Sequence, residues 1–268
     1  MNRRFIASLL GFGIWFLGFI SGCARPHINL PTDPGIPLPD FNAIHMQLSA
    51  ACVGVRTLTA EMALSGRAGR QRLRGRVLAG FARPASMRLE GVAPFGPPAF
   101  ILVARGENAT LLLPRDERVL RGAKPEDILG ALAGVTLGPA DLQAILTGCV
   151  VAAPQPTAAR RYANGWASID LAGGATIFLQ PTAGGMWTLR AARRAGWQIE
   201  YPEWSGGFPQ TVRLQATQPA LMVDLTVGLS QIETNKDLED AAFNVNVPRD
   251  AEAITLDELR ESGPLGAR

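Results

Sequence analysis

Charged residues alternate with apolar residues or glycine along the stretch Arg72-Leu73-Arg74-Gly75-Arg76-Val77. Because successive side chains of a β-strand point to opposite faces, this period of two predicts a strand with one polar and one apolar face. The alternation returns at Met87-Arg88-Leu89-Glu90. We therefore expect a sheet whose apolar face has to be covered by other parts of the chain.

Further strands are expected on both sides of this stretch, from Thr57 onward. Two of them are separated by Gly106-Glu107-Asn108, which is typical of a hairpin. In a later strand, Trp197, Ile199 and Tyr201 share one face. The later strands are expected at residues 100–105, 109–113, 165–171, 175–180, 186–192, 197–204, 210–217 and 221–231. Many short strands joined by hairpins indicate one antiparallel sheet, curved or partly closed.

Three segments have the apolar spacing of amphipathic helices: residues 41–55, 125–133 and 139–147. The last two have proline in the first turn, where it is well tolerated. These helices are the expected cover of the apolar face. The predicted fold is mainly β within the α+β class, a curved antiparallel sheet covered by a lid of a few helices. The cover either packs the interior solid or leaves a ligand cavity.

The amino terminus has the pattern of an export signal. Arg3 and Arg4 are followed by an apolar stretch over residues 5–20 and then by Ser21-Gly22-Cys23. The stretch is shorter than the roughly 20 residues that a membrane-spanning helix needs, and small residues before Cys23 are typical of a cleavage site. We expect residues 1–22 to be a signal peptide.

A cut directly before a cysteine resembles the processing of bacterial lipoproteins. That resemblance implies a covalent lipid on Cys23, and Ala24 in the next position implies the outer membrane, with the domain facing the periplasm. Two or three acyl chains make a stable anchor at about 0.8 kcal/mol per buried methylene. Residues 23–40, rich in proline, are expected to form an extended tether. The alternative is an ordinary cleaved signal followed by a coincidental cysteine.

Composition and motifs exclude several classes of function. The formal net charge is +3, of which Arg3 and Arg4 supply two charges, so the exported chain is close to neutral and is not expected to bind nucleic acid. Both histidines, His27 and His45, lie in the tether and the first helix, which excludes a histidine-rich metal site. The sequence has no nucleophile elbow, phosphate loop or dinucleotide fingerprint. We expect no enzyme, no metal and no cofactor apart from the lipid.

Besides Cys23, the chain contains Cys52 and Cys149. In an oxidising periplasm this pair can form one disulfide. Two buried free thiols are the alternative, and the sequence leaves both open because it does not give the distance between them.

The first strands are rich in arginine and contain no acid between Met62 and Leu89. Such a group can attract anionic lipid headgroups, at about 1 kcal/mol for each side chain near the surface. The alternative is a solvated outer strand face. The arginines are Arg67, Arg70, Arg72, Arg74 and Arg76.

Residues 86–100, Ser-Met-Arg-Leu-Glu-Gly-Val-Ala-Pro-Phe-Gly-Pro-Pro-Ala-Phe, resemble a segment of the LolA/LolB-like lipoprotein carrier superfamily, and in particular its LolB-like outer-membrane branch. In that branch a strand ends in a Pro–apolar–Gly loop and the next strand begins. The likeness continues through residues 109–113 and the two helices that start with proline. It implies a half-barrel over residues 41–235. The C-terminal extension, 236–268, goes beyond the compact pattern of that branch.

The resemblance also implies a function. An outer-membrane lipoprotein of this kind accepts the acyl chains of lipoproteins from a periplasmic LolA-like carrier and inserts them among outer membrane lipids, and we expect it to act as a monomer. Phe95, between Pro94 and Gly96, matches the membrane-insertion loop, unless it folds back onto the sheet. The expected lining of the acyl cavity is Met87, Leu89, Phe100, Leu102, Leu111, Leu113, Trp187, Leu189, Trp197, Ile199 and Tyr201. The alternative is an envelope lipoprotein that uses the same fold as an assembly or scaffold module.

Overall fold

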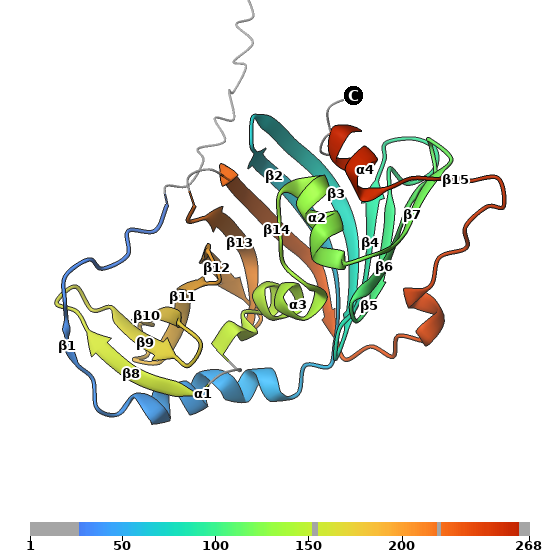
Figure 1. The fold of residues 1–268 in the computed structure, drawn as a ribbon. Helices are drawn as coiled ribbons and strands as arrows, with labels where there is room; N and C mark the ends of the chain where they lie inside the picture. The colour runs from blue at the N-terminus through green and yellow to red at the C-terminus, as the bar shows by residue number, and fades with distance from the viewer. Residues whose placement is uncertain (1–26, 152–154, 219–220, 263–268) are drawn as a thin grey trace, which may run out of the picture.

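The computed structural model describes residues 27–151, 155–218 and 221–262. Within these ranges, fifteen strands form one strongly curved sheet that does not close, with helices on its concave side (Figure 1). The strands are β1 (Ile36–Pro37), β2 (Thr57–Ala68), β3 (Gln71–Ala82), β4 (Ser86–Val92), β5 (Ile101–Arg105), β6 (Asn108–Leu113), β7 (Arg118–Ala123), β8 (Pro156–Arg161), β9 (Ala167–Leu171), β10 (Ala175–Pro181), β11 (Trp187–Arg194), β12 (Trp197–Ser205), β13 (Phe208–Ala216), β14 (Val223–Thr234) and β15 (Glu252–Ala253). The predicted fold class is confirmed.

Strands that follow one another in the chain mostly pair as antiparallel neighbours. The two halves of the sheet meet where β14 pairs with β2, with Asp224 opposite Arg67. Arg67 in turn lies opposite Arg72 of β3, and Arg76 lies opposite Val92 of β4. The start of β14, the β2–β3 turn and the β4–β5 loop therefore lie at the same end of the sheet, which we call the arginine end.

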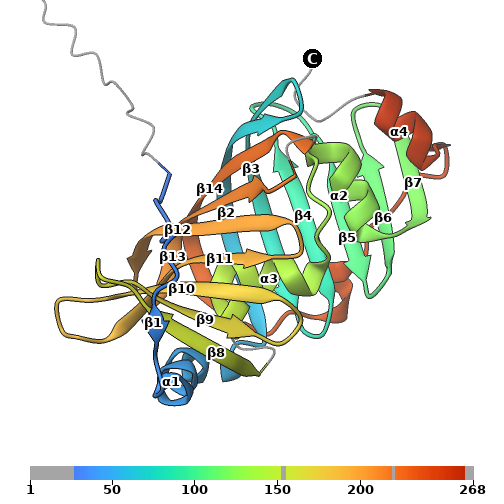
Figure 2. The same ribbon diagram turned by 60° about the vertical axis from the view of Figure 1, so that its left-hand side comes forward.

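The helices are α1 (Phe41–Val53), α2 (Pro125–Ala133), α3 (Pro139–Thr147) and α4 (Leu256–Ser262), with short 3-10 helices η1 (Cys149–Val151) and η3 (Asp240–Phe243). Both α2 and α3 lie against the concave face, and α1 lies at the end opposite the arginine end (Figures 1 and 2). The bounds predicted for α2 and α3 are confirmed. Each has proline in its first turn, and each ends at a glycine in the left-handed conformation, Gly134 or Gly148.

Four strands were not predicted from the sequence: β1, β7, β8 and β15. In β8, which begins where a loop was expected, only Ala159 is buried, so this strand has no apolar alternation to detect. The strands β1 and β15 have two residues each and form only because they pair with β8 and β7.

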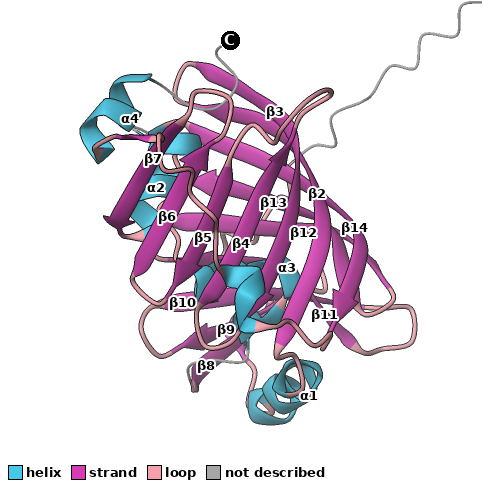
Figure 3. Cartoon of the chain, turned by 90° about the vertical axis from the view of Figure 1, so that its right-hand side faces the viewer, coloured by secondary structure: helices cyan, strands magenta, loops and turns pink. Residues whose placement is uncertain are grey.

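The first described residues and the η3 helix of the C-terminal extension lie on the convex, outer face of the sheet. Residues 27–38 belong to the segment expected to be an extended tether, and they cross this face and pair through β1 (Figure 2). The C-terminal extension likewise packs against the body. Its η3 crosses the outer face of β4 and β5 (Figure 3), its β15 pairs with β7, and its α4 lies beside α2 with Leu259 buried.

Candidate lipid-binding site

An apolar cavity of about 250 Å³ lies between α2 and the concave face of β2, β3 and β4. The strand positions that face it include Gly75, and a Cβ atom built on Gly75 would meet no atom within 4 Å. The cavity therefore exists partly because this inward position carries no side chain. The lining residues are Met62, Leu64, Leu73, Arg74, Gly75, Arg76, Val77, Leu89, Gly91, Val92, Ala99, Phe100, Leu129, Leu132 and Ala133.

The cavity lies at the arginine end of the sheet. α2 ends at Gly134, and a Cβ atom built there would come within 2.9 Å of Val223 and 3.4 Å of Ala68, which flank the β2–β3 turn. Arg74 and Arg76 belong to the lining. The cavity is thus close to the turn that carries the exposed arginines.

A second glycine shapes the wall of the cavity. The ring of Phe100 lies over Gly91, so close that a Cβ atom on Gly91 would lie 2.5 Å from Cδ1 and Cε1 of the ring. Gly91 and Phe100 also form a backbone pair, because Gly91 N–H donates to Phe100 O at 3.0 Å. Gly91 thus allows the aromatic ring to lie flat on the sheet as part of the cavity wall.

We predict that Gly91→Val destabilises the fold by about 1–3 kcal/mol, because the ring of Phe100 must move out of a well-packed position. Urea unfolding followed by tryptophan fluorescence measures the change. The control is Gly80→Val in the neighbouring strand, where an added Cβ atom meets nothing within 4 Å. Equal unfolding free energies for the two variants would contradict this account.

Of the eleven residues predicted to line an acyl cavity, Leu89 and Phe100 line this one. The structure places the other nine elsewhere in the core, with Trp187 partly exposed. These nine are Met87, Leu102, Leu111, Leu113, Trp187, Leu189, Trp197, Ile199 and Tyr201.

Below α3, aromatic side chains of β12 pack directly against the helix. The hydroxyl of Tyr201 donates to Ile145 O at 3.1 Å, and its complete burial raises the pKa of Tyr201 far above its usual range. The indole of Trp204 packs so tightly on Gly148 that a Cβ atom there would lie 2.3 Å from the ring. At these two positions, large aromatic side chains fill the space between β12 and α3.

The predicted insertion loop projects from the arginine end. Phe95 is 88% exposed, and Gly96 next to it has φ +76°, in the left-handed region. The base of the loop is closed by Ala99 N–H, which donates to Gly91 O at 2.9 Å. The guanidinium of Arg115, in the β6–β7 turn, donates to the carbonyls of Phe95 and Pro97. Phe95 does not fold back onto the sheet, because the backbone on both sides of it is held by these bonds.

The arginines of the first strands are exposed, and most of them lie near the β2–β3 turn. Arg67 and Arg72 are direct cross-strand neighbours, and Arg70 lies in the turn itself. Arg76 differs from these arginines because it forms a salt bridge, with its Nε 3.2 Å from a carboxylate oxygen of Glu61. The exposed positive charge therefore concentrates at Arg67, Arg70, Arg72 and Arg74.

Cys52 and Cys149 are joined by a disulfide, which links the end of α1 to the start of η1. The sequence had left this pairing and two free thiols as alternatives. Residues 1–22 and Cys23, the predicted lipidation site, lie outside the described residues.

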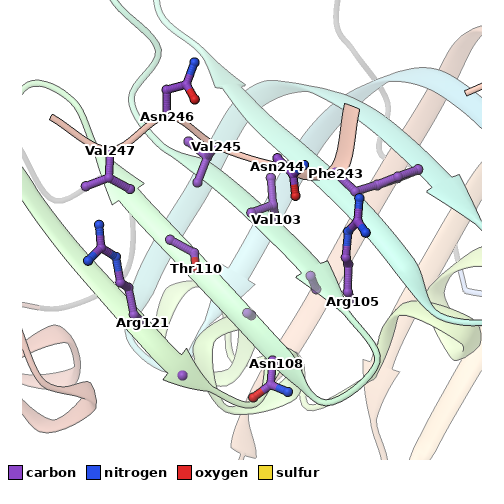
Figure 4. A pocket seen from close by; sticks show the side chains of 13 residues that line it. Val103, Arg105, Asn108, Thr110, Arg121, Phe243, Asn244, Val245, Asn246 and Val247 are labelled. Atoms are coloured by element: carbon purple, nitrogen blue, oxygen red, sulfur yellow. The ribbon is translucent and has the colours of Figure 1, made fainter. Parts of the chain in front are cut away.

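A larger pocket, about 560 Å³, lies on the outer face between β5–β7 and the C-terminal extension (Figure 4). Its lining includes Arg105, Arg121, Asn108, Asn244 and Asn246. The lining mixes these polar side chains with apolar ones such as Phe243 and Val245. Acyl chains gain free energy only where water is excluded from apolar surface, so this hollow suits them less well than the cavity under α2.

Within the described residues, no group of three or more His, Cys, Asp and Glu side chains is placed to hold a metal ion. No helix among them is long and apolar enough to cross a membrane.

Comparison with known proteins finds similarity in structure only. No family model and no curated protein matches the sequence. Among solved structures, a LolA superfamily protein from Nitrosomonas europaea is similar with a TM-score of 0.51 and 10% identity, over 76% of this chain and 97% of that one. A DUF1329 family protein from Desulfovibrio piger gives a TM-score of 0.47 and 12% identity, over 78% and 98%. The chain therefore has the fold of the LolA superfamily.

Proposed function

We propose that this chain is a lipid-anchored acceptor of lipoproteins at the outer membrane. In this proposal, the cavity under α2 receives an acyl chain, and the Phe95 loop delivers the cargo into the bilayer. The observation that carries the proposal is the adjacency of the two features, because Val92, Ala99 and Phe100 belong both to the cavity lining and to the base of the loop. A chain leaving the cavity at this point is already beside the exposed aromatic side chain.

Transfer by this route needs no catalytic residue. Each methylene moved from water into the cavity contributes about 0.8 kcal/mol, so small differences in apolar lining set the direction of handover between a LolA-like carrier, this acceptor and the membrane. The cavity of about 250 Å³ is slightly smaller than ordinary ligand pockets, which begin near ~300 Å³. We therefore propose that α2 moves outward when a whole chain enters.

We predict that Phe95→Glu lowers partitioning of the protein into phosphatidylcholine vesicles by roughly tenfold or more, since burying a phenylalanine side chain contributes about 1.5–3 kcal/mol. Vesicle flotation measures the partitioning. Thermal stability should not change, because Phe95 is 88% exposed. The matched control is Met186→Glu, another exposed apolar residue, 62% exposed, in the β10–β11 turn. An equally large loss of partitioning into vesicles for Met186→Glu would rule out a specific role for the Phe95 loop.

The whole proposal is tested by transfer. The soluble chain from residue 24 onward is mixed with a purified periplasmic carrier that holds a labelled lipoprotein, and the label on each protein is followed with time. Movement of label to this chain supports the acceptor function. No movement, together with no lipid co-purifying by mass spectrometry, would reject it. Mass spectrometry of the membrane fraction tests in parallel whether Cys23 carries acyl chains.

The alternative, a scaffold or assembly module, is favoured by two observations. Tyr201 and Trp204 pack directly against α3, and a hollow larger than the cavity under α2 lies on the outer face. For this alternative, we expect stable capture of another envelope protein on the outer face and no transfer of label.

A further inference from the structure

A carboxylate on the outer face of the sheet is almost completely buried. Glu200 of β12 alternates with Ile199 and Tyr201, which face the core, so Glu200 points outward, yet it is only 1% exposed. Residues at the start of the described chain cover it. Ile28 N–H donates to Glu200 Oε2 at 3.2 Å, and His27 Nδ1 lies 3.3 Å from Oε1. Gln198 donates to the same carboxylate at 3.0 Å.

The same histidine also contacts β14, which lies two strands away from β12 in the sheet. Its Nε2 lies 3.3 Å from Asp224 Oδ2, at the start of β14. Arg213 Nη1 lies 3.9 Å from Glu200, and its side chain is mostly buried. A buried carboxylate is costly unless hydrogen bonds and charge satisfy it. The partners around Glu200 therefore fix the position of residues 27 and 28 on the sheet.

The docking continues along the segment. Ile28 and Leu30 pack on a second apolar cluster, formed by Tyr162, Trp166, Phe178 and Ala191 on the outer face. Further along, Leu38 N–H donates to Ala159 O at 3.0 Å, and the Leu38 side chain is buried. Polar contacts at one end, apolar packing in the middle and strand pairing at the other end hold residues 27–38.

This docking shortens the connection to the expected lipid. If residues 23–40 were a free tether, the domain could lie up to about 60 Å from Cys23 at 3.3–3.6 Å per residue. With His27 fixed on the sheet, the four steps from Cys23 span at most about 14 Å. His27 contacts Asp224, which pairs with Arg67, so the docked segment begins at the arginine end.

We propose that residues 27–38 act as a clasp that orients the domain on the membrane to which Cys23 is anchored. The clasp holds the arginine end, with the Phe95 loop and the cavity, against the lipid surface, and keeps the opposite end in the periplasm. The partner surface is a phospholipid bilayer, which the arginines and Phe95 contact together. This inference rests on the lipid anchor proposed above.

The experiment attaches a lipid to Cys23 by a chemical reaction, so it does not depend on lipidation of Cys23 in the cell. The chain from Cys23 onward is coupled through the Cys23 thiol to a maleimide lipid in phosphatidylcholine vesicles. Cys52 and Cys149 do not react, because they are joined to each other. A benzophenone amino acid replaces Phe95 in one sample. In a second it replaces Met186, which lies in a turn at the opposite strand ends. Photocrosslinks to lipid are counted by mass spectrometry.

We expect about tenfold more lipid adduct from position 95 than from position 186, because the short connection raises the local concentration of one end only. A flexible spacer of about 12 glycine and serine residues, inserted after Cys23, should reduce this ratio to near one, since it spans roughly 20 Å on average. The spacer leaves all docked residues unchanged, so it should not affect folding. The double variant Ile28→Ser, Leu30→Ser should act in the same way by releasing the clasp.

Two results would overturn the clasp. Equal adducts from both positions without the spacer would show that docking does not orient the domain. A ratio that stays near tenfold with the spacer would show that the Phe95 loop orients the domain unaided. This second result would leave the acceptor function standing, whereas failure of that function would appear in the transfer assay, which uses no anchor.

Discussion

Gly75→Leu is expected to weaken binding of an acyl chain by roughly 100-fold while the fold stays intact. Gly75 faces the cavity, an added Cβ atom meets nothing within 4 Å, and its backbone has no positive φ. A leucine side chain therefore enters the cavity without strain. Its four carbon atoms displace about four methylenes, which at about 0.8 kcal/mol each amounts to about 3 kcal/mol.

Displacement of a fluorescent fatty acid measures this loss, and urea unfolding verifies the fold. The matched control is Ser65→Leu, because Ser65 is exposed and alternates with Met62 and Leu64 on β2, so the same side chain is added outside the cavity. Unchanged affinity in Gly75→Leu would place the acyl chain elsewhere. An equal loss of fatty-acid affinity in Gly75→Leu and Ser65→Leu would indicate a general effect of added apolar surface.

Removing the disulfide is expected to lower the free energy of unfolding by about 4 kcal/mol. Cys52 and Cys149 are 97 residues apart in the sequence, and a cross-link over a loop of about 100 residues restricts the unfolded chain by up to about 4.7 kcal/mol. The variant Cys52→Ala, Cys149→Ala keeps small apolar side chains at both buried positions. Urea denaturation of the variant and of the original chain, each with and without dithiothreitol, measures the difference.

The original chain should lose stability when dithiothreitol is added. The stability of the variant should be the same with and without dithiothreitol. A reductant effect of the same size in the variant would mean that the measured loss has another source. Lipid binding by the folded variant should persist, since neither cysteine lines the cavity.

The sequence contains local signals for most of the fold. Proline in the first turn and a left-handed glycine at the end define α2 and α3 to the residue. Trp197, Ile199 and Tyr201 were expected on one face, and all three lie in the core. These predictions succeed because each depends on neighbours within one turn or one strand.

The cavity could not be located in the same way. α2 and α3 have similar patterns, yet α2 lies over an apolar cavity, whereas aromatic side chains of β12 pack directly against α3. The difference lies in what faces each helix: Gly75 and Gly91 below α2, but Tyr201 and Trp204 below α3. Which strand residues meet which helix depends on sheet register and curvature, and the sequence pattern does not contain these.

The docked N-terminal segment was missed for a related reason. Glu200 alternates with apolar residues, as an ordinary solvated outer position does, and residues 27–40 are rich in proline without apolar periodicity. The carboxylate and the segment that covers it are separated by 172 residues. Only the folded sheet brings them together.

The two shortest strands of the sheet, β1 and β15, affect the tendency of the protein to aggregate. The outermost long strands, β7 and β8, would otherwise present unpaired N–H and C=O groups, which can recruit strands from other chains and start aggregation. Within the described residues, β15 covers part of β7 and β1 covers part of β8. Both covers come from segments flanking the half-barrel predicted over residues 41–235. A fragment limited to that range would therefore expose two adhesive edges, whereas the longer chain shields them.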